Sequence, residues 1–157
     1  MKRQEKLSWY KKEFESINKN IETKKSLSHY DFLRIRNFKL QNSSAEEESH
    51  IEKITKDAFI LAKEDEIEGA INKLQELEGV GVPIASTILA MKYPDRFAII
   101  DRKVISALDN KDKDNWLKDY LTSSKTYKEY LLLMRKNASK EGMALRDYER
   151  GLWEEGR

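Results

Sequence analysis

Leu77-Glu78-Gly79-Val80-Gly81-Val82-Pro83-Ile84-Ala85 lies between two segments whose apolar residues recur at helical spacing. Glycine lets the backbone turn sharply and approach another backbone closely, because it has no Cβ. Such a turn, opening a helix with Pro83 at its first position, leaves N–H groups that can bind an anion such as a nucleic-acid phosphate. The sequence therefore predicts helices over 67–77 and 83–92, packed as an antiparallel pair around a turn at 78–82.

The rest of the chain also has the pattern of helices. Apolar residues recur every three or four positions, and no segment alternates with the two-residue period of a strand. Residues 97–100 form a short apolar link that runs into Asp101, where a further helix is expected to begin. We predict an all-α fold with one compact helical domain over 1–157, which contains the helix-hairpin-helix motif at 67–92.

Composition restricts the possible cofactors. The 157 residues include no cysteine, which excludes disulfides, thiolate zinc sites and iron–sulfur clusters held by thiolates. His29 and His50 lack the neighbouring ligands that a metal site needs. No cofactor is expected, although a monovalent cation could bind at the hairpin. No apolar run reaches the length of a membrane span, so a cytoplasmic protein is expected.

The net charge of +2 is small, but the charge is distributed unevenly. Residues 1–44 carry a balance of +6, residues 45–81 a balance of −7, and residues 82–157 a balance of +3. A phosphate-binding surface could therefore use the N-terminal segment and the chain after the hairpin. The alternative is that these lysine-rich helices simply have solvated faces.

The hairpin and the following acid together resemble the helix-hairpin-helix superfamily of DNA glycosylases, which includes endonuclease III, the adenine glycosylase and the 8-oxoguanine glycosylases. The family motif is roughly Leu-x-Gly-Val-Gly-x-x-x-Ala, with a catalytic Asp twenty residues after the second glycine. The residues that match in register are Leu77, Gly79, Val80, Gly81, Ala85 and Asp101. The resemblance is specific over about residues 67–108 and implies two small helical layers with a cleft.

The resemblance also implies roles for the matching positions. Backbone amides at the turn would hold a DNA phosphate; the residues expected to supply them are Gly79, Val80, Gly81 and Ile84. Asp101 would stabilise the positive charge that develops on the sugar, or activate water. The same residue could instead be only the N-cap of the next helix. Both roles can coexist, because one carboxylate oxygen can cap while the other faces a substrate.

Position 83 bears on the type of chemistry. In the bifunctional members of the family a lysine stands two residues after the second glycine, and this chain has Pro83 there. The resemblance therefore points to a monofunctional enzyme that uses water as its nucleophile. Lys39 and Lys103 are the alternative amines that could supply lyase activity.

The base pocket is less well defined by sequence. A base that leaves the helical stack needs aromatic or apolar faces to hold it. Phe38 and Tyr93 are candidates for these faces, and Gln41 and Asn42 are candidates for a wedge that fills the vacated space. The expected partner is double-stranded DNA with a flipped base, bound by a monomer that is associated with the nucleoid.

Two classes of function remain open on the sequence alone. The first is a monofunctional DNA N-glycosylase that removes a damaged or modified base, in repair or in defence against modified phage DNA. The second is a non-catalytic DNA-binding protein in which Asp101 is only a helix cap.

Overall fold

The computed structural model describes residues 2–39 and 46–156, which form nine helices and no strand. The helices are α1 (Arg3–Ile21), α2 (His29–Lys39), α3 (Glu48–Lys63), α4 (Ile67–Leu74), α5 (Val82–Lys92), α6 (Arg102–Ala107), α7 (Lys113–Asp119), α8 (Ser124–Lys140) and α9 (Leu145–Glu155). The predicted all-α class is confirmed for this part of the chain. Among the described residues, no helix is both long enough and apolar enough to cross a membrane.

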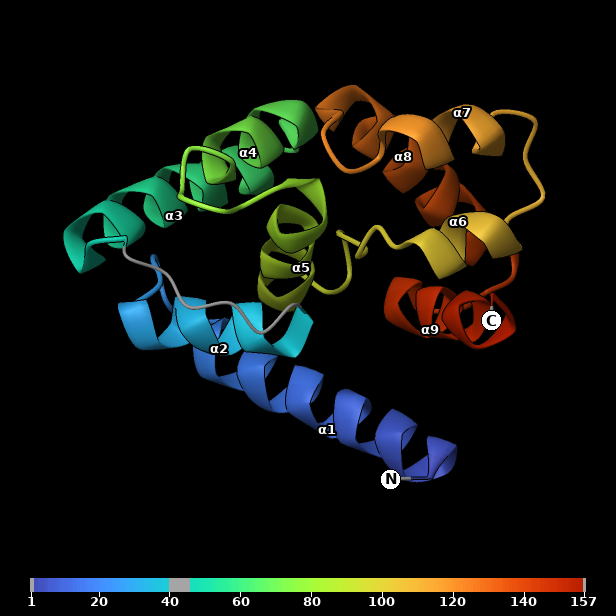
Figure 1. The fold of residues 1–157 in the computed structure, drawn as a ribbon, viewed down its shortest axis with the longest axis horizontal. Helices are drawn as coiled ribbons and strands as arrows, with labels where there is room; N and C mark the ends of the chain where they lie inside the picture. Colours follow the sequence, from blue (N-terminus) through green and yellow to red (C-terminus); the bar gives the residue numbers. More distant parts are fainter. Residues whose placement is uncertain (1, 40–45, 157) are drawn as a thin grey trace.

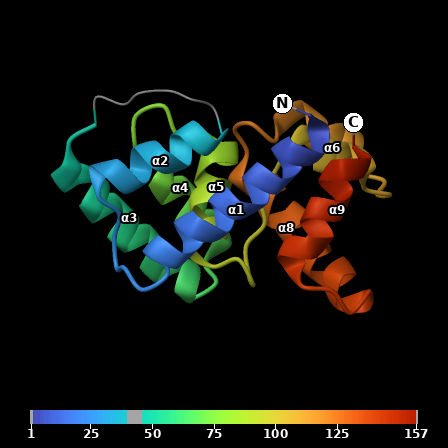
Figure 2. The same ribbon diagram turned by 90° about the horizontal axis from the view of Figure 1, so that it is seen from below.

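The helices lie in two groups joined by the extended link before Asp101 (Figure 1). Helices α1–α5 form the first group and α6–α9 the second, and α4 packs against α8. Helix α1 runs diagonally below α2 and α5, and its N-terminal end reaches α9 (Figure 2). There the Arg3 guanidinium donates to the Glu154 carbonyl at 3.2 Å. Helix α1 therefore contacts both groups of helices.

Helix α5 is at the centre of the hydrophobic core. Ten of its eleven residues are buried, as expected for a helix that is enclosed by others on all sides. It begins at Val82 with Gly81 as its N-cap, one residue earlier than predicted, so Pro83 occupies the second position. Proline is tolerated there because the first-turn N–H groups have no partner within the helix.

The first helix of the hairpin is shorter than predicted. Helix α4 ends at Leu74 rather than at Leu77. Beyond it the chain continues in tighter turns, in which the Glu76 amide donates to the Lys73 carbonyl at 3.0 Å and the Leu77 amide to the Leu74 carbonyl at 3.1 Å. Leu77 is nevertheless buried, because these turns keep its side chain on the core side.

The link over 97–100 is extended, as predicted, and its carbonyls are bonded by side chains. The Tyr127 hydroxyl donates to the Ala98 carbonyl at 2.8 Å, and the Tyr130 hydroxyl donates to the Ile99 carbonyl at 2.7 Å. Both tyrosines are on α8 and are fully buried. A buried carbonyl outside regular secondary structure needs such a donor, so α8 fixes the path of the link.

We expect the two buried tyrosines to make the fold sensitive to alkali. Burial raises the pKa of Tyr127 and Tyr130 above the ordinary 10.0, so the folded chain keeps protons that the unfolded chain releases. Their contribution to the free energy of unfolding is constant below about pH 10 and falls as the pH rises further. Urea unfolding measured across this range should show the decline.

Single variants identify the source of that decline. Tyr130→Phe should lose part of the alkaline slope. Tyr30→Phe should keep all of it, because Tyr30 is 71% exposed. An identical slope in both variants would show that other groups cause the sensitivity.

Candidate functional site

The turn of the hairpin depends on Gly79 and on an arginine from α2. Gly79 has a φ of 72°, a conformation that residues with a Cβ rarely adopt. The Arg36 guanidinium donates through Nη1 to the Glu78 carbonyl at 2.8 Å, and a Cβ on Gly79 would lie only 2.9 Å from Nη2. Arg36 is itself buried. Glycine at this position therefore lets the buried guanidinium hold the turn.

An acid two residues before α3, Glu46, contacts the other side of the turn. Glu46 Oε2 accepts a hydrogen bond from the Glu78 amide at 2.7 Å, and Oε1 lies 2.6 Å from His50 Nδ1. The bond from His50, followed by that from the Glu78 amide, lowers the pKa of Glu46. Both backbone polar groups of Glu78, its N–H and its carbonyl, are therefore hydrogen-bonded to side chains, which fixes the shape of the turn.

Three of the four amides predicted to contact phosphate are unpaired within the described residues, and one of the three belongs to the buried Ile84. Within the described part of the chain, the N–H groups of Gly79, Gly81 and Ile84 have no hydrogen-bond acceptor. Val80 differs from the prediction, because its N–H donates to the Leu77 carbonyl at 3.2 Å. That bond closes the turn itself and leaves the Val80 amide unable to serve a ligand.

Asp101 uses its two carboxylate oxygens differently. Oδ1 accepts from the Lys103 amide at 2.7 Å, which is the N-cap bond of α6. Oδ2 accepts from the Lys39 ammonium at 2.9 Å, and the Asp101 side chain is 21% exposed. One oxygen therefore caps the helix, as predicted, while the other, which was expected to face a substrate, is bonded to the Lys39 ammonium of α2.

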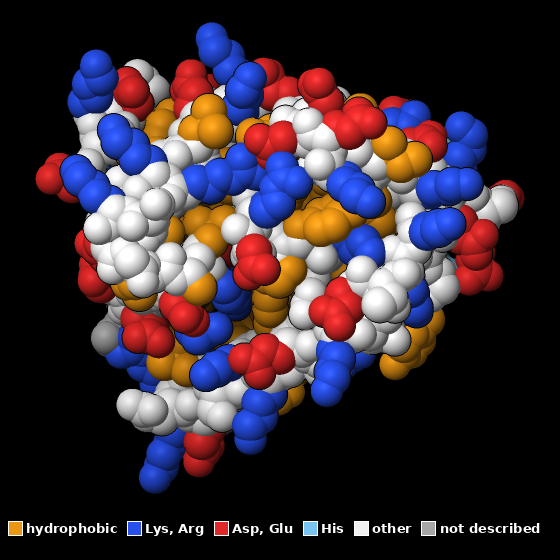
Figure 3. Space-filling view, turned by 180° about the vertical axis from the view of Figure 1, so that it is seen from behind, with side chains coloured by type: hydrophobic (Ala, Val, Ile, Leu, Met, Phe, Trp, Pro, Cys, Tyr) orange, Lys and Arg blue, Asp and Glu red, His pale blue; other side chains and the backbone are white. Residues whose placement is uncertain are grey.

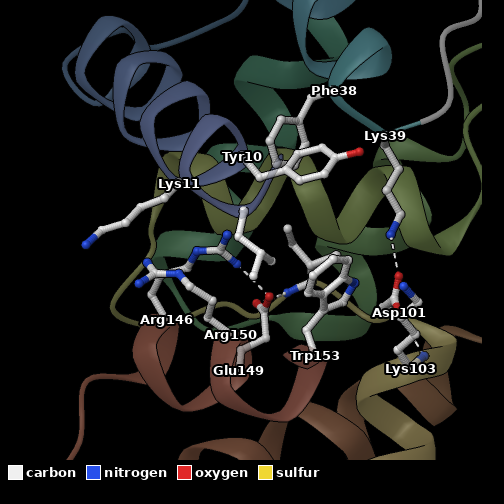
Figure 4. Close-up of a pocket in the computed structure, with 12 residues that line it drawn as sticks. Tyr10, Lys11, Phe38, Lys39, Asp101, Lys103, Arg146, Glu149, Arg150 and Trp153 are labelled. Atoms are coloured by element: carbon white, nitrogen blue, oxygen red, sulfur yellow. Dashed lines mark hydrogen bonds and ion pairs between the residues drawn. The ribbon is translucent and has the colours of Figure 1, made fainter. Parts of the chain in front are cut away.

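A pocket of about 250 Å³ opens beside Asp101, between helices of the two groups (Figure 4). Its aromatic lining consists of Tyr10 from α1, Phe38 from α2 and Trp153 from α9. The Tyr10 ring meets Phe38 edge-on at 5.5 Å between centroids, and it meets Trp153 at 6.3 Å. These rings supply flat apolar faces next to a carboxylate.

A buried acid of α9, Glu149, bonds the backbone of the link beside the pocket. Glu149 Oε1 accepts from the Ile99 amide at 2.8 Å, and Oε2 accepts from the Arg146 guanidinium at 2.5 Å. In the adjoining peptide, the Ile100 amide donates to Ser86 Oγ at 3.0 Å. The residues just before Asp101 are therefore bonded through their amides as well as through their carbonyls, which fixes the backbone position of the acid.

The structure brings some of the predicted pocket residues together and not others. Phe38 lines the pocket, but Tyr93 does not. The Tyr93 ring packs on Phe59 and its hydroxyl donates to the Phe59 carbonyl at 3.3 Å, so it belongs to the core around α3 and α5. Gln41 and Asn42 lie outside the described residues.

Both lysines proposed as alternative amines line the pocket. Lys39 is paired with Asp101, and the Lys103 ammonium lies 4.3 Å from the centroid of the Trp153 ring. Lys39 and Arg36 are three residues apart on α2, which puts them on one face of that helix. Helix α2 therefore contacts the hairpin turn through one cation and Asp101 through the other.

The sequence did not predict the contacts that Arg36, Glu149, Tyr127 and Tyr130 make. One signal was present for Glu149, which lies four residues after Leu145 and three before Leu152, on the apolar side of its helix. An acid at such a position needs buried donors. The others have partners distant in sequence, which no local pattern indicates.

The charged surface is mixed in sign. On the face opposite to that of Figure 1, Lys and Arg side chains surround a hollow in which hydrophobic side chains are exposed, with Asp and Glu side chains between them (Figure 3).

Comparison of the chain with protein-family models, curated proteins and solved structures finds no match.

Proposed function

We propose that the chain is a monofunctional DNA N-glycosylase. The observation that carries the proposal is Asp101, whose carboxylate has one oxygen on the helix cap and the other at an aromatic-lined pocket. The pocket's 250 Å³ is sufficient for a single nucleobase, and the rings of Tyr10 and Phe38 are suited to contact one. The unpaired hairpin amides are suited to a DNA phosphate.

In the proposed mechanism, the amides of Gly79, Gly81 and Ile84 hold a backbone phosphate while the target base rotates into the pocket. The bond between the base and C1′ breaks, its electron pair leaves with the base, and positive charge develops on the sugar. Asp101 Oδ2 stabilises that charge and accepts a proton from a water molecule as the water oxygen adds to C1′, and the carboxyl then returns this proton to the departed base anion. For this step the Lys39 ammonium moves from Oδ2 to a DNA phosphate.

Two features support water rather than an amine as the nucleophile. Position 83 carries proline in place of the family's lysine. The Lys39 amine forms an ion pair with Asp101 Oδ2 at 2.9 Å, so it is engaged by a carboxylate and not positioned as a free nucleophile.

Duplexes that each carry one defined lesion test this proposal. Incubation with the protein should leave an abasic site at one class of lesion, with the strand intact until it is heated in alkali. Borohydride should trap no covalent complex. A trapped complex would overturn the monofunctional assignment and direct attention to Lys39 and Lys103.

Binding to lesion-free duplex should depend strongly on salt and weakly on sequence. Contacts through phosphates release counterions, and the logarithm of the binding constant falls by about 0.9 for each tenfold increase in salt per phosphate contacted. Fluorescence anisotropy with several unrelated duplexes over a salt series measures both effects. A salt-independent affinity would mean that phosphates are not the main contact.

The Lys39–Asp101 ion pair also favours a second candidate function. With both carboxylate oxygens already engaged, Asp101 could serve only as a cap and as an anchor for α2. The chain would then be a DNA-binding module without activity. The two candidates differ in one observable: only the enzyme leaves abasic sites in a lesion panel.

A further inference from the structure

The pocket beside Asp101 carries an excess of positive charge. Five of its lining residues are Lys or Arg and two are Asp or Glu. The two acids are each paired, Asp101 with Lys39 and Glu149 with Arg146. Of the other lining cations, Arg150 is paired at 3.5 Å with Asp147, which does not line the pocket, and the Lys11 side chain extends away from it (Figure 4), so Lys103 is the cation without an ion pair among the described residues that faces the pocket. A ligand in this pocket therefore meets nitrogen donors and positive charge that the pocket's own acids do not neutralise.

The Trp153 ring of the pocket already has a cation over its face. The Lys103 ammonium lies 4.3 Å from the centroid of the Trp153 ring, within the range of a cation–π interaction (Figure 4). Trp is the best aromatic partner for a cation. A positively charged base that entered the pocket would lose that partner to Lys103 and would be repelled by the same ammonium.

The donor set favours a different kind of base. Lys103 and Arg150 are donors only, and they can accept no hydrogen bond. Carbonyl oxygens and unprotonated ring nitrogens on the edge of a base complement such donors. Amino groups on that edge do not, because they are donors themselves.

Resting on the proposed glycosylase function, we propose that Lys103 is a specificity-determining residue. It makes the pocket select uncharged bases with carbonyl edges, the class produced by deamination or oxidation. The same residue excludes the cationic bases that N-alkylation produces. The selection is a matter of charge and hydrogen-bond pattern, since both classes are planar and of similar size.

The experiment has a binding arm that does not need catalysis. Quenching of tryptophan fluorescence compares 2′-deoxyinosine, which is neutral, with 1-methyl-2′-deoxyadenosine, which is cationic at neutral pH. The neutral nucleoside should bind at least about tenfold more tightly, which corresponds to about 1.4 kcal/mol. Equal or tighter binding of the cation, or no binding of either, would overturn the inference.

The second arm measures excision from duplexes that contain uracil, hypoxanthine or 8-oxoguanine, and from duplexes that contain 7-methylguanine or 3-methyladenine. Excision of the first set alone supports the inference, and preferred excision of the alkylated set overturns it. If no duplex is cut but the nucleoside preference is present, the glycosylase function fails and the selectivity of the pocket stands.

Variants connect the preference to Lys103 itself. Lys103→Met should reduce the ratio of neutral to cationic binding by about tenfold, and Lys103→Arg should retain it, because Arg also interacts with the Trp153 ring. Lys136→Met makes the same change of charge at an exposed position of α8 and should leave the ratio unchanged. An equal effect of the Lys103 and Lys136 substitutions would show that only overall charge matters, and would overturn the assignment of Lys103.

Discussion

Asp101→Asn should reduce the rate of base excision by about 10²–10³-fold while leaving the affinity for lesion DNA almost unchanged. The substitution removes the negative charge that stabilises the sugar cation. Asparagine can still accept the Lys103 amide as an N-cap. The lost ion pair with Lys39 is partly exposed, so the free energy of unfolding should fall by no more than about 1 kcal/mol.

Single-turnover excision, binding to uncut lesion duplex and urea unfolding together check this expectation. Asp109→Asn is the matched control, since Asp109 is an exposed aspartate close in sequence to the site and does not line the pocket. Full excision by Asp101→Asn would reduce Asp101 to a cap. If both activity and stability were lost together, the effect would be structural rather than catalytic.

Glu149→Leu should destabilise the fold by about 3–5 kcal/mol. Glu149 is only 4% exposed, and its loss would leave the Ile99 amide and the Arg146 guanidinium without their acceptor. A buried donor or cation that loses its partner costs most of its desolvation free energy. The link to Asp101 would be freed at the same time, so excision should fall beyond what the lower stability explains.

Thermal and urea unfolding measure the loss. Glu155→Leu is the control, because Glu155 is on the same helix but exposed, and its substitution should change the free energy of unfolding by less than about 0.5 kcal/mol. Glu149→Gln should be intermediate, since an amide oxygen still accepts from Ile99. Similar stabilities of the two leucine variants would mean that the hydrogen bonds of Glu149 contribute little.

Local patterns predicted the parts of the site that are close in sequence. The glycine turn, the buried helix after it, the extended link and the capping role of Asp101 all follow from spacing and backbone chemistry within a short stretch. Lys39 was named from the sequence only as an alternative amine. Its ion pair with Asp101, 62 residues further along the chain, was not predicted.

The contacts that could not be predicted join residues that are far apart in the sequence. Arg36 reaches the hairpin from 42 residues away, and Glu149 reaches the link from 50 residues away. Helical periodicity identifies the face of a helix that is buried but not the partner that covers it. Tyr93 was a candidate for the pocket but packs on Phe59 in the core. Its position near the hairpin is compatible with either location, so the sequence could not distinguish them.

The side-chain bonds to the extended link have a consequence for hydrogen exchange. The amides of Ile99 and Ile100 are buried and bonded to Glu149 and Ser86, although the segment belongs to no helix. Exchange at buried bonded amides requires opening of the surrounding structure. These two amides should therefore exchange with solvent deuterium as slowly as those of α5, and their protection would report directly on how firmly the backbone before Asp101 is held.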